Sequence, residues 1–199
     1  MSTYDRKDKY YEKAKEEGYR SRAAYKLLEL QKKFKIIDYG NTIMDLGAWP
    51  GGWLQVGGKL VGGRGRAVGI DLVEMGGFHD DRIITIIGDV RDLEELLPKF
   101  ESTKDIKAFD VILSDMSPKL CGIREIDQAK SVGCAELAMY VAEKWLKKGG
   151  WWVVKVFKGN DTEEFYRSIR KKFEKLHRVE LDSTRKTSDE FYLVGKGWI

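Results

Sequence analysis

Residues 42–53 read TIMDLGAWPGGW, and this stretch decides the fold. An apolar run with strand character leads directly into a turn that holds Gly47, Gly51 and Gly52, and a helical pattern follows. Glycine has no Cβ, so such a turn can bend sharply and lets the backbone approach a ligand closely. The stretch therefore predicts a strand, a glycine-rich turn and a helix, which is the unit of ligand-binding α/β sheets.

Strand-like and helical segments alternate along the rest of the chain. The strand-like runs are 42–46, 66–70, 83–87, 109–114, 151–157, 176–181 and 190–196. The helix candidates are 4–16, 21–35, 51–62, 92–100, 127–148 and 161–173. Ser21 and Asp127 can cap two of these helices, and Gly149 can end the longest. The alternation predicts an α/β, Rossmann-like fold, in which about seven mostly parallel strands carry helices on both faces and two further helices come first.

Size and composition favour one domain that spans residues 1–199. A chain of 199 residues with 42% hydrophobic content can fill one core. No stretch approaches the roughly 18 apolar residues of a membrane span, and residues 1–20 are rich in charge, so we expect a cytoplasmic protein. The two cysteines and two histidines are scattered, so we expect neither a metal site nor a disulfide. No heptad pattern demands a dimer, and we expect a monomer.

The net positive charge is concentrated in residues 1–35, a basic helical extension. This segment holds 11 Lys and Arg against 6 Asp and Glu, whereas the whole chain carries +4, so the remainder is slightly acidic. Such an extension suits a polyanionic partner such as RNA. A solvated helical face with mixed charges explains the same pattern equally well.

Four successive strand-like runs end in, or are followed by, an aspartate: Asp45, Asp71, Asp89 and Asp115. Aspartate is a poor strand residue, and carboxylates at one sheet edge repel each other, so packing does not explain the pattern. Asp71 follows Gly51 by about 20 residues, the spacing at which a carboxylate binds a ribose in nucleotide-binding sheets. A nicotinamide dinucleotide site is the natural alternative, but Trp49 stands where the second glycine of GxGxxG belongs.

The segment DLGAWPGGW (45–53) resembles motif I of the class I methyltransferases. Four further segments, SRAAYKLLELQKKF (21–34), LSDMSP (113–118), VVKVF (153–157) and SDEFYLVGKG (188–197), complete a wider resemblance. In order and character they are similar to the FtsJ (RlmE-like) ribosomal RNA 2′-O-methyltransferases, and the resemblance covers nearly the whole chain. That family often has a small residue where this chain has Trp49.

The resemblance implies a Rossmann-like class I methyltransferase fold with S-adenosylmethionine as the cofactor. The implied cofactor-binding residues are Asp45, Gly47, Gly51, Gly52, Trp53, Asp71, Asp89 and Asp115. Among them, Asp71 is expected at the cofactor ribose and Asp89 by the adenine. The family's catalytic tetrad falls on Lys26, Asp115, Lys155 and Glu190.

The resemblance also implies a substrate. We expect methyl transfer to the ribose 2′-hydroxyl of a uridine in large-subunit ribosomal RNA, with the large ribosomal subunit as partner. Related enzymes modify the anticodon loop of transfer RNA, and the sequence leaves that alternative open. Two other classes also remain: a small-molecule methyltransferase, and a non-catalytic protein that binds S-adenosylmethionine.

The chemistry of methyl transfer agrees with the tetrad. A ribose hydroxyl is a weak nucleophile, so a base beside it helps. Lys155 lies in the apolar run WWVVKVF, where burial favours the neutral amine, as does a second cation at Lys26; Asp115 and Glu190 favour the ammonium form. We hypothesise that Lys155 accepts the proton, that Asp115 orients Lys155, and that Lys26 and Glu190 hold the ribose and neighbouring phosphate. Taken alone, Lys155 reads as a lysine at the end of a buried strand.

Overall fold

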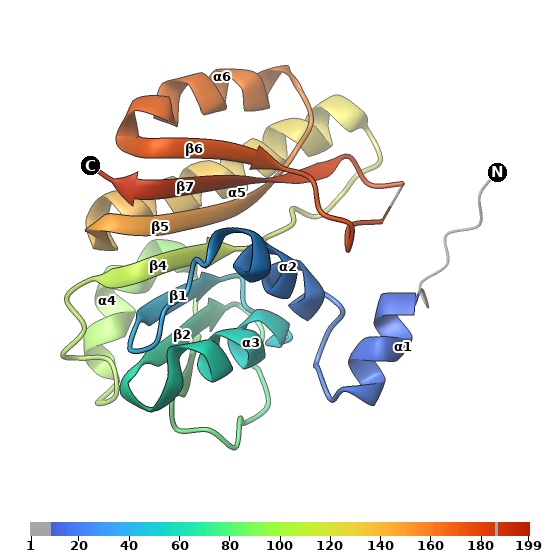
Figure 1. Cartoon of the computed structure of the whole chain (residues 1–199). Helices are drawn as coiled ribbons and strands as arrows, with labels where there is room; N and C mark the ends of the chain where they lie inside the picture. Colours follow the sequence, from blue (N-terminus) through green and yellow to red (C-terminus); the bar gives the residue numbers. More distant parts are fainter. Residues whose placement is uncertain (1–8, 186) are drawn as a thin grey trace.

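The computed structural model describes residues 9–185 and 187–199, in which seven strands form one sheet with the order β3-β2-β1-β4-β5-β7-β6 (Figure 1). The strands are β1 (Thr42–Leu46), β2 (Arg66–Asp71), β3 (Ile83–Ile87), β4 (Phe109–Ser114), β5 (Leu146–Phe157), β6 (Phe173–Val179) and β7 (Glu190–Trp198). Strand β7 runs antiparallel to both of its neighbours, while the other pairings are parallel. The predicted mostly parallel sheet of seven strands is confirmed.

Helices cover both faces of the sheet, also as predicted (Figure 1). The helices are α1 (Lys9–Glu16), which lies apart from the sheet (Figure 1), α2 (Ala24–Phe34), α3 (Gly52–Val61), α4 (Leu93–Leu96), α5 (Arg124–Trp145) and α6 (Asn160–Ile169). Helix α1 matches the end of the predicted 4–16 helix, whose first five residues lie outside the described part of the chain. Within that described part, the structure has no helix that combines the length and the apolar character needed to cross a membrane.

Two apolar clusters form the core, one on each face of the sheet. On β5, Trp152 and Val154 pack into the cluster beneath α4, α5 and α6, while Val153 packs into the cluster beneath α2 and α3. Successive strand residues point to opposite faces, so Lys155 shares the face of Val153 and lies on the side of α2. The face that carries α2 is therefore the face on which the predicted catalytic residues must meet.

Helix α5 begins earlier and ends earlier than predicted. It starts at Arg124, so Asp127 lies in its first turn and is not its N-cap. The Asp127 carboxylate instead accepts hydrogen bonds from the backbone N–H groups of Cys121 (2.8 Å) and Gly122 (3.0 Å), in the loop before the helix. At the other end, Leu146 already belongs to β5 and pairs with Phe109, so Gly149 lies within the strand and does not stop the helix.

The predicted cap at Ser21 is also wrong. Helix α2 begins at Ala24 after Ala23, and no side chain caps it. Ser21 is held by tertiary packing, because a Cβ added at Gly52 would lie only 2.3 Å from the Ser21 hydroxyl oxygen. The close contact with the start of α3 fixes this segment in place of a capping hydrogen bond.

Trp152 belongs to the core. Its side chain is fully buried, stacks on Phe173 with 5.6 Å between ring centroids, and donates a hydrogen bond of 3.1 Å from Nε1 to the carbonyl of Ala138. We expect Trp152→Ala to lower the free energy of unfolding by about 3–5 kcal/mol, because it leaves a large cavity. Urea denaturation measures this. Tyr39→Ala, at a ring that is 66% exposed, is the matched control and should change stability by about 0.5 kcal/mol or less. Equal losses in the two variants would contradict the assignment.

Candidate active site

The site lies at the point where the strand order reverses, between β1 and β4. In sheets of this kind a crevice opens there at the carboxyl ends of the strands. The turn after β1 and the loop after β4 touch, since a Cβ added at Gly47 would lie 2.3 Å from Cγ of Met116. Gly47 also has a φ of +70°, which favours glycine. A side chain at this position would therefore push the two loops apart.

The rest of the glycine turn approaches protein side chains. Gly51 has a φ of +106°, and a Cβ there would lie 2.5 Å from Cζ of Phe78. Gly52 lies against Ser21, as described above. Trp53 is buried, and its Nε1 donates a hydrogen bond of 2.8 Å to the carbonyl of Ala23, directly before α2. Trp53 thus anchors α2 to α3 from within the core, so its contribution to a cofactor site is to position this junction.

Asp71 organises the edge of the crevice at the end of β2. Its two carboxylate oxygens accept hydrogen bonds from the backbone N–H groups of Trp49 and Val73, each at 2.9 Å. These bonds tie the glycine turn to the end of β2, and each oxygen keeps a further lone pair for a ligand hydroxyl. Asp89 is bound by Arg91, whose guanidinium and backbone N–H lower the pKa of the Asp89 carboxyl to about 2.

Asp45 lies deepest in the site. It is 2% exposed, and its Oδ2 has no hydrogen-bond partner among the described residues. Burial raises the pKa of the Asp45 carboxyl well above its usual value, and the charges of Asp115 and Asp71 raise it further. Three mutually repelling carboxylates suit a cationic ligand. S-adenosylmethionine, with its sulfonium and ammonium groups, fits that requirement, and the remaining lone pairs of the Asp71 carboxylate are suited to hydroxyl groups.

The predicted catalytic side chains form one cluster, in which Lys26 and Lys155 contact Asp115, the first residue after β4, and Glu190 joins through Lys26. The Asp115 Oδ1 atom lies 3.5 Å from Nζ of Lys26 and 3.2 Å from Nζ of Lys155. Lys155 Nζ also donates a hydrogen bond of 2.7 Å to the Asp115 carbonyl oxygen. Lys26 Nζ reaches Glu190 Oε1 at 2.6 Å. Residues from α2, β4, β5 and β7 are thus joined into one cluster, although 164 positions separate the first from the last.

The charges in this cluster compensate one another. Burial lowers the pKa of Lys26, but the charges of Asp115 and Glu190 outweigh burial and raise that pKa. Burial raises the pKa of Asp115, but Lys155, Lys26 and a hydrogen bond from Tyr192 outweigh burial and lower it. Lys26 is therefore an ammonium and Asp115 a carboxylate at neutral pH.

Tyr192 is a member of the cluster that the sequence analysis missed. Its ring is fully buried and its hydroxyl donates a hydrogen bond of 2.6 Å to Asp115 Oδ1. Burial, followed by the charge of Asp115, raises the pKa of Tyr192 well above its usual value, so the hydroxyl keeps its proton. Strand alternation could have found this residue, because Tyr192 lies two positions after Glu190 on the same face of β7.

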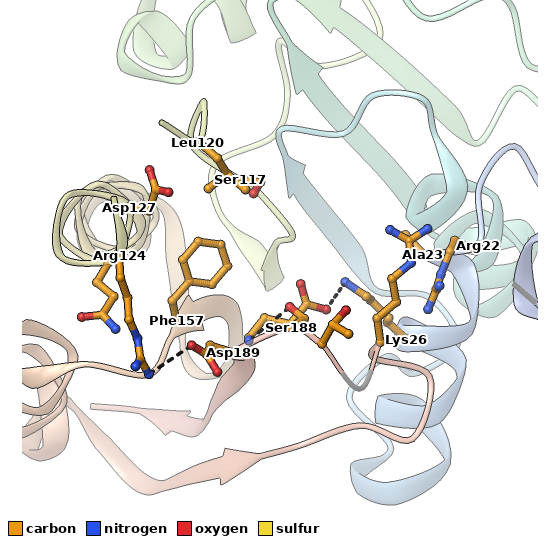
Figure 2. Close-up of a pocket in the computed structure, with 14 residues that line it drawn as sticks. Arg22, Ala23, Lys26, Ser117, Leu120, Arg124, Asp127, Phe157, Ser188 and Asp189 are labelled. Carbon is orange, nitrogen blue, oxygen red and sulfur yellow. Dashed lines mark hydrogen bonds and ion pairs between the residues drawn. The ribbon is translucent and has the colours of Figure 1, made fainter. Parts of the chain in front are cut away.

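A cavity of about 720 Å³ opens beside this cluster (Figure 2). Lys26 and Glu190 line it, together with residues of the loops that follow β4 and β6. In Figure 2, Arg22 and Lys26 lie at one end of the cavity, and Phe157, Leu120 and α5 lie at the other. The cluster is therefore open to a ligand that is larger than a water molecule.

The sheet, the glycine turn and the acidic residues at the switch point define a Rossmann-like, S-adenosylmethionine-dependent methyltransferase. Aeropyrum pernix fibrillarin, a structure described as holding natively bound S-adenosylmethionine, shares this fold, with a TM-score of 0.62 at 16% identity over 86% of this chain and 75% of that chain. The profile of the FtsJ-like methyltransferases matches residues 19–198, so this chain belongs to that family.

Individual relatives agree with this membership. Two proteins named ribosomal RNA large subunit methyltransferase E are similar: that of Pseudomonas fluorescens is 40% identical over 96% of this chain and 90% of its own length. That of Halorubrum lacusprofundi is 42% identical over 96% of this chain and 71% of its own. A crystal structure described as a ribosomal RNA methyltransferase from Plasmodium falciparum aligns with a TM-score of 0.77 and 27% identity, covering 90% of this chain and 98% of that chain.

The raised pKa of Asp45 makes stability depend on pH. Between the ordinary carboxyl pKa and the raised one, the folded protein keeps a proton that the unfolded chain releases, so stability falls as pH rises. Asp45→Asn removes this loss. We expect the Tm of the variant, relative to the wild type, to be higher at about pH 8 than at about pH 5. Differential scanning calorimetry measures it, with Asp81→Asn on the surface as the control. A Tm difference that does not change with pH would contradict the assignment of Asp45 as a buried carboxyl group whose pKa is raised.

Proposed function

We propose that this protein transfers a methyl group from S-adenosylmethionine to a ribose 2′-hydroxyl of large-subunit ribosomal RNA. The observation that carries the proposal is the cluster of Lys26, Asp115, Lys155 and Glu190 at the carboxyl ends of the strands. The names of the relatives supply the substrate, and the basic segment before β1 suits a polyanion. A uridine is the proposed target nucleotide.

The cofactor is held by the acidic side of the crevice. Asp71 accepts hydrogen bonds from its ribose hydroxyls, Asp89 lies by the adenine, and the turn at Gly47 faces its methionine part. The carboxylate of Asp115 offsets its positive charges, and the buried carboxyl group of Asp45 lies beside it as a hydrogen-bonding group. When bound, S-adenosylmethionine supplies the electrophilic methyl group, and the protein supplies alignment and proton removal.

Lys155 is the proposed base. A neutral amine has two N–H groups and one lone pair. The carbonyl and carboxylate of Asp115, at 2.7 and 3.2 Å from Nζ, can take both N–H groups. Asp115 thereby orients the amine so that its lone pair is left for the ribose hydroxyl. The hydroxyl proton passes to Nζ as the oxygen attacks, and water removes it afterwards.

Lys26 and Glu190 hold the nucleotide. Both line the cavity, and their ion pair of 2.6 Å keeps each in place. Glu190 also accepts a hydrogen bond of 3.2 Å from the Thr184 hydroxyl. The carboxylate of Glu190 is suited to accept a hydrogen bond from a ribose hydroxyl, and the ammonium of Lys26 is suited to contact the neighbouring phosphate.

The proposed substrate is tested with S-adenosylmethionine that carries a labelled methyl group. The purified protein is incubated with large ribosomal subunits, with deproteinised ribosomal RNA and with transfer RNA, and the labelled nucleoside is then mapped. Label in a 2′-O-methyluridine of large-subunit RNA supports the proposal. Label in transfer RNA alone indicates the anticodon-loop alternative, and cofactor binding without transfer to any RNA indicates a small-molecule enzyme or a binding protein.

The same proposal includes the setting in which the protein works. A ribosomal RNA substrate agrees with action in the cytoplasm. We also propose that the chain folds as a single domain and acts as a monomer. Light scattering on the purified protein tests the last point, because a mass well above 22.9 kDa would contradict it.

We expect Lys155→Ala to lower kcat on RNA by at least about 10²-fold, the lower end of what a positioned base contributes. The KM for S-adenosylmethionine should change little, because Lys155 is not proposed to hold the cofactor. Lys158→Ala is the matched control, since that lysine is exposed three residues further on and pairs with Glu180. Calorimetry establishes that both variants fold. Near-normal turnover by a folded Lys155→Ala protein would contradict the assignment.

A further inference from the structure

The cavity beside the cluster has an apolar part that the catalytic tetrad does not use. Phe157 and Leu120 line it at the end away from Arg22 (Figure 2). Leu120 is 58% exposed, so its side chain is accessible to a ligand in the cavity. The same end also carries the charged side chains of Arg124 and Asp127, so its apolar surface consists of Phe157 and Leu120. An apolar surface at one end of a cavity and cationic side chains at the other are complementary to a nucleotide, in which an apolar base face and an anionic phosphate lie on either side of the ribose.

Strand geometry places Phe157 next to the tetrad. On β5, Lys155 and Phe157 are two residues apart and share one face. Across the antiparallel pairing, Lys155 lies opposite Tyr192 and Phe157 lies opposite Glu190. Residues that face each other in this way have Cβ atoms about 5 Å apart. Phe157 is therefore the cross-strand neighbour of Glu190. If Glu190 holds a ribose, the attached base would lie near the ring of Phe157.

Phe157 is fixed in place without being part of the core. Its backbone N–H donates to the Ser131 hydroxyl (3.1 Å), and its carbonyl accepts from the Thr162 hydroxyl (2.7 Å); both of these side chains are buried. Yet its own side chain is only half-buried and belongs to neither apolar cluster of the described residues. An aromatic ring on a fixed backbone that faces a cavity is suited to stacking, because the backbone loses little conformational entropy when a base packs on the ring.

We propose that this cavity is the binding site of the nucleotide to be methylated, with its base stacked on Phe157 against Leu120. This inference rests on the proposed function and deepens it. The phosphate then points to Arg22 and the ribose lies between, at Lys26 and Glu190. Stacking on Phe157 requires a base that has left its neighbours in the RNA, so the substrate is an unpaired or flipped-out nucleotide.

The test combines a change in the protein with a change in the RNA. The substrate is a transcript that spans the mapped target nucleotide, either free or rebuilt into the subunit, whichever form the wild type methylates. A second version is abasic at the target position and keeps its ribose. We expect Phe157→Ala to lower kcat/KM on the intact RNA by about 10-fold, the usual effect of losing one stacking platform. On the abasic RNA, the wild type should fall by a similar factor and Phe157→Ala should cause no further loss.

Controls separate stacking from structural damage. Phe157→Tyr keeps the ring and should retain near-normal kcat/KM. Tyr140→Ala truncates another aromatic ring, 45% exposed on α5, and should leave kcat/KM unchanged. An equal loss by Phe157→Ala on both RNAs would indicate a merely structural role and overturn the proposal, as would no loss on the intact RNA. A wild-type protein that methylates no RNA is a different result, which overturns the proposed function itself.

Discussion

The largely buried carboxylate of Asp115 is the constraint on which the rest of the site depends. Removing a carboxylate from water is costly unless opposite charges and hydrogen bonds replace the lost hydration. Here Lys155, Lys26 and Tyr192 supply them from three different elements. Because none of these groups is adjacent to Asp115 in the sequence, the charge can be satisfied only when α2, β5 and β7 are docked against β4. The charge of Asp115 is therefore compensated only when the site is assembled.

The antiparallel strand β7 makes this assembly compact. It lies beside β5, and its first residue, Glu190, lies opposite Phe157 at the carboxyl ends of the parallel strands. A parallel strand in the same place would present its last residues at that end. The reversal therefore places the start of β7, with Glu190 and Tyr192, next to Lys155. Helix α2 adds Lys26 to the cluster, on the face of the sheet to which the Lys155 side chain points.

The strands were predictable from sequence because short apolar runs between polar turns are a strong local signal. The proximity of the tetrad followed from motif resemblance, because the rule that polar residues after parallel strands share one edge applies only to its Asp115. The two predicted helix caps were wrong because tertiary contacts determine the positions of both side chains. Ser21 packs against Gly52, and Asp127 binds a loop that precedes its helix. Tyr192 was missed because a tyrosine in a strand is usually a packing residue, and only its partner Asp115 gives its hydroxyl a role.

The distribution of charge explains how one crevice can receive two ligands of opposite sign. The carboxyl groups of Asp45 and Asp71 lie on the side of β1 and β2, and the negative charges of Asp71 and Asp115, which raise the pKa of Asp45, favour a cationic cofactor there and repel RNA phosphates. The cationic side chains of Arg22 and Lys26 lie on α2 or directly before it, in the segment that carries the basic excess of the sequence. Lys26 contacts Asp115 and also lines the cavity, so it stands at the boundary between the two halves. A polyanion drawn to the N-terminal segment is thereby guided to the one edge of the crevice where its ribose can reach Lys155.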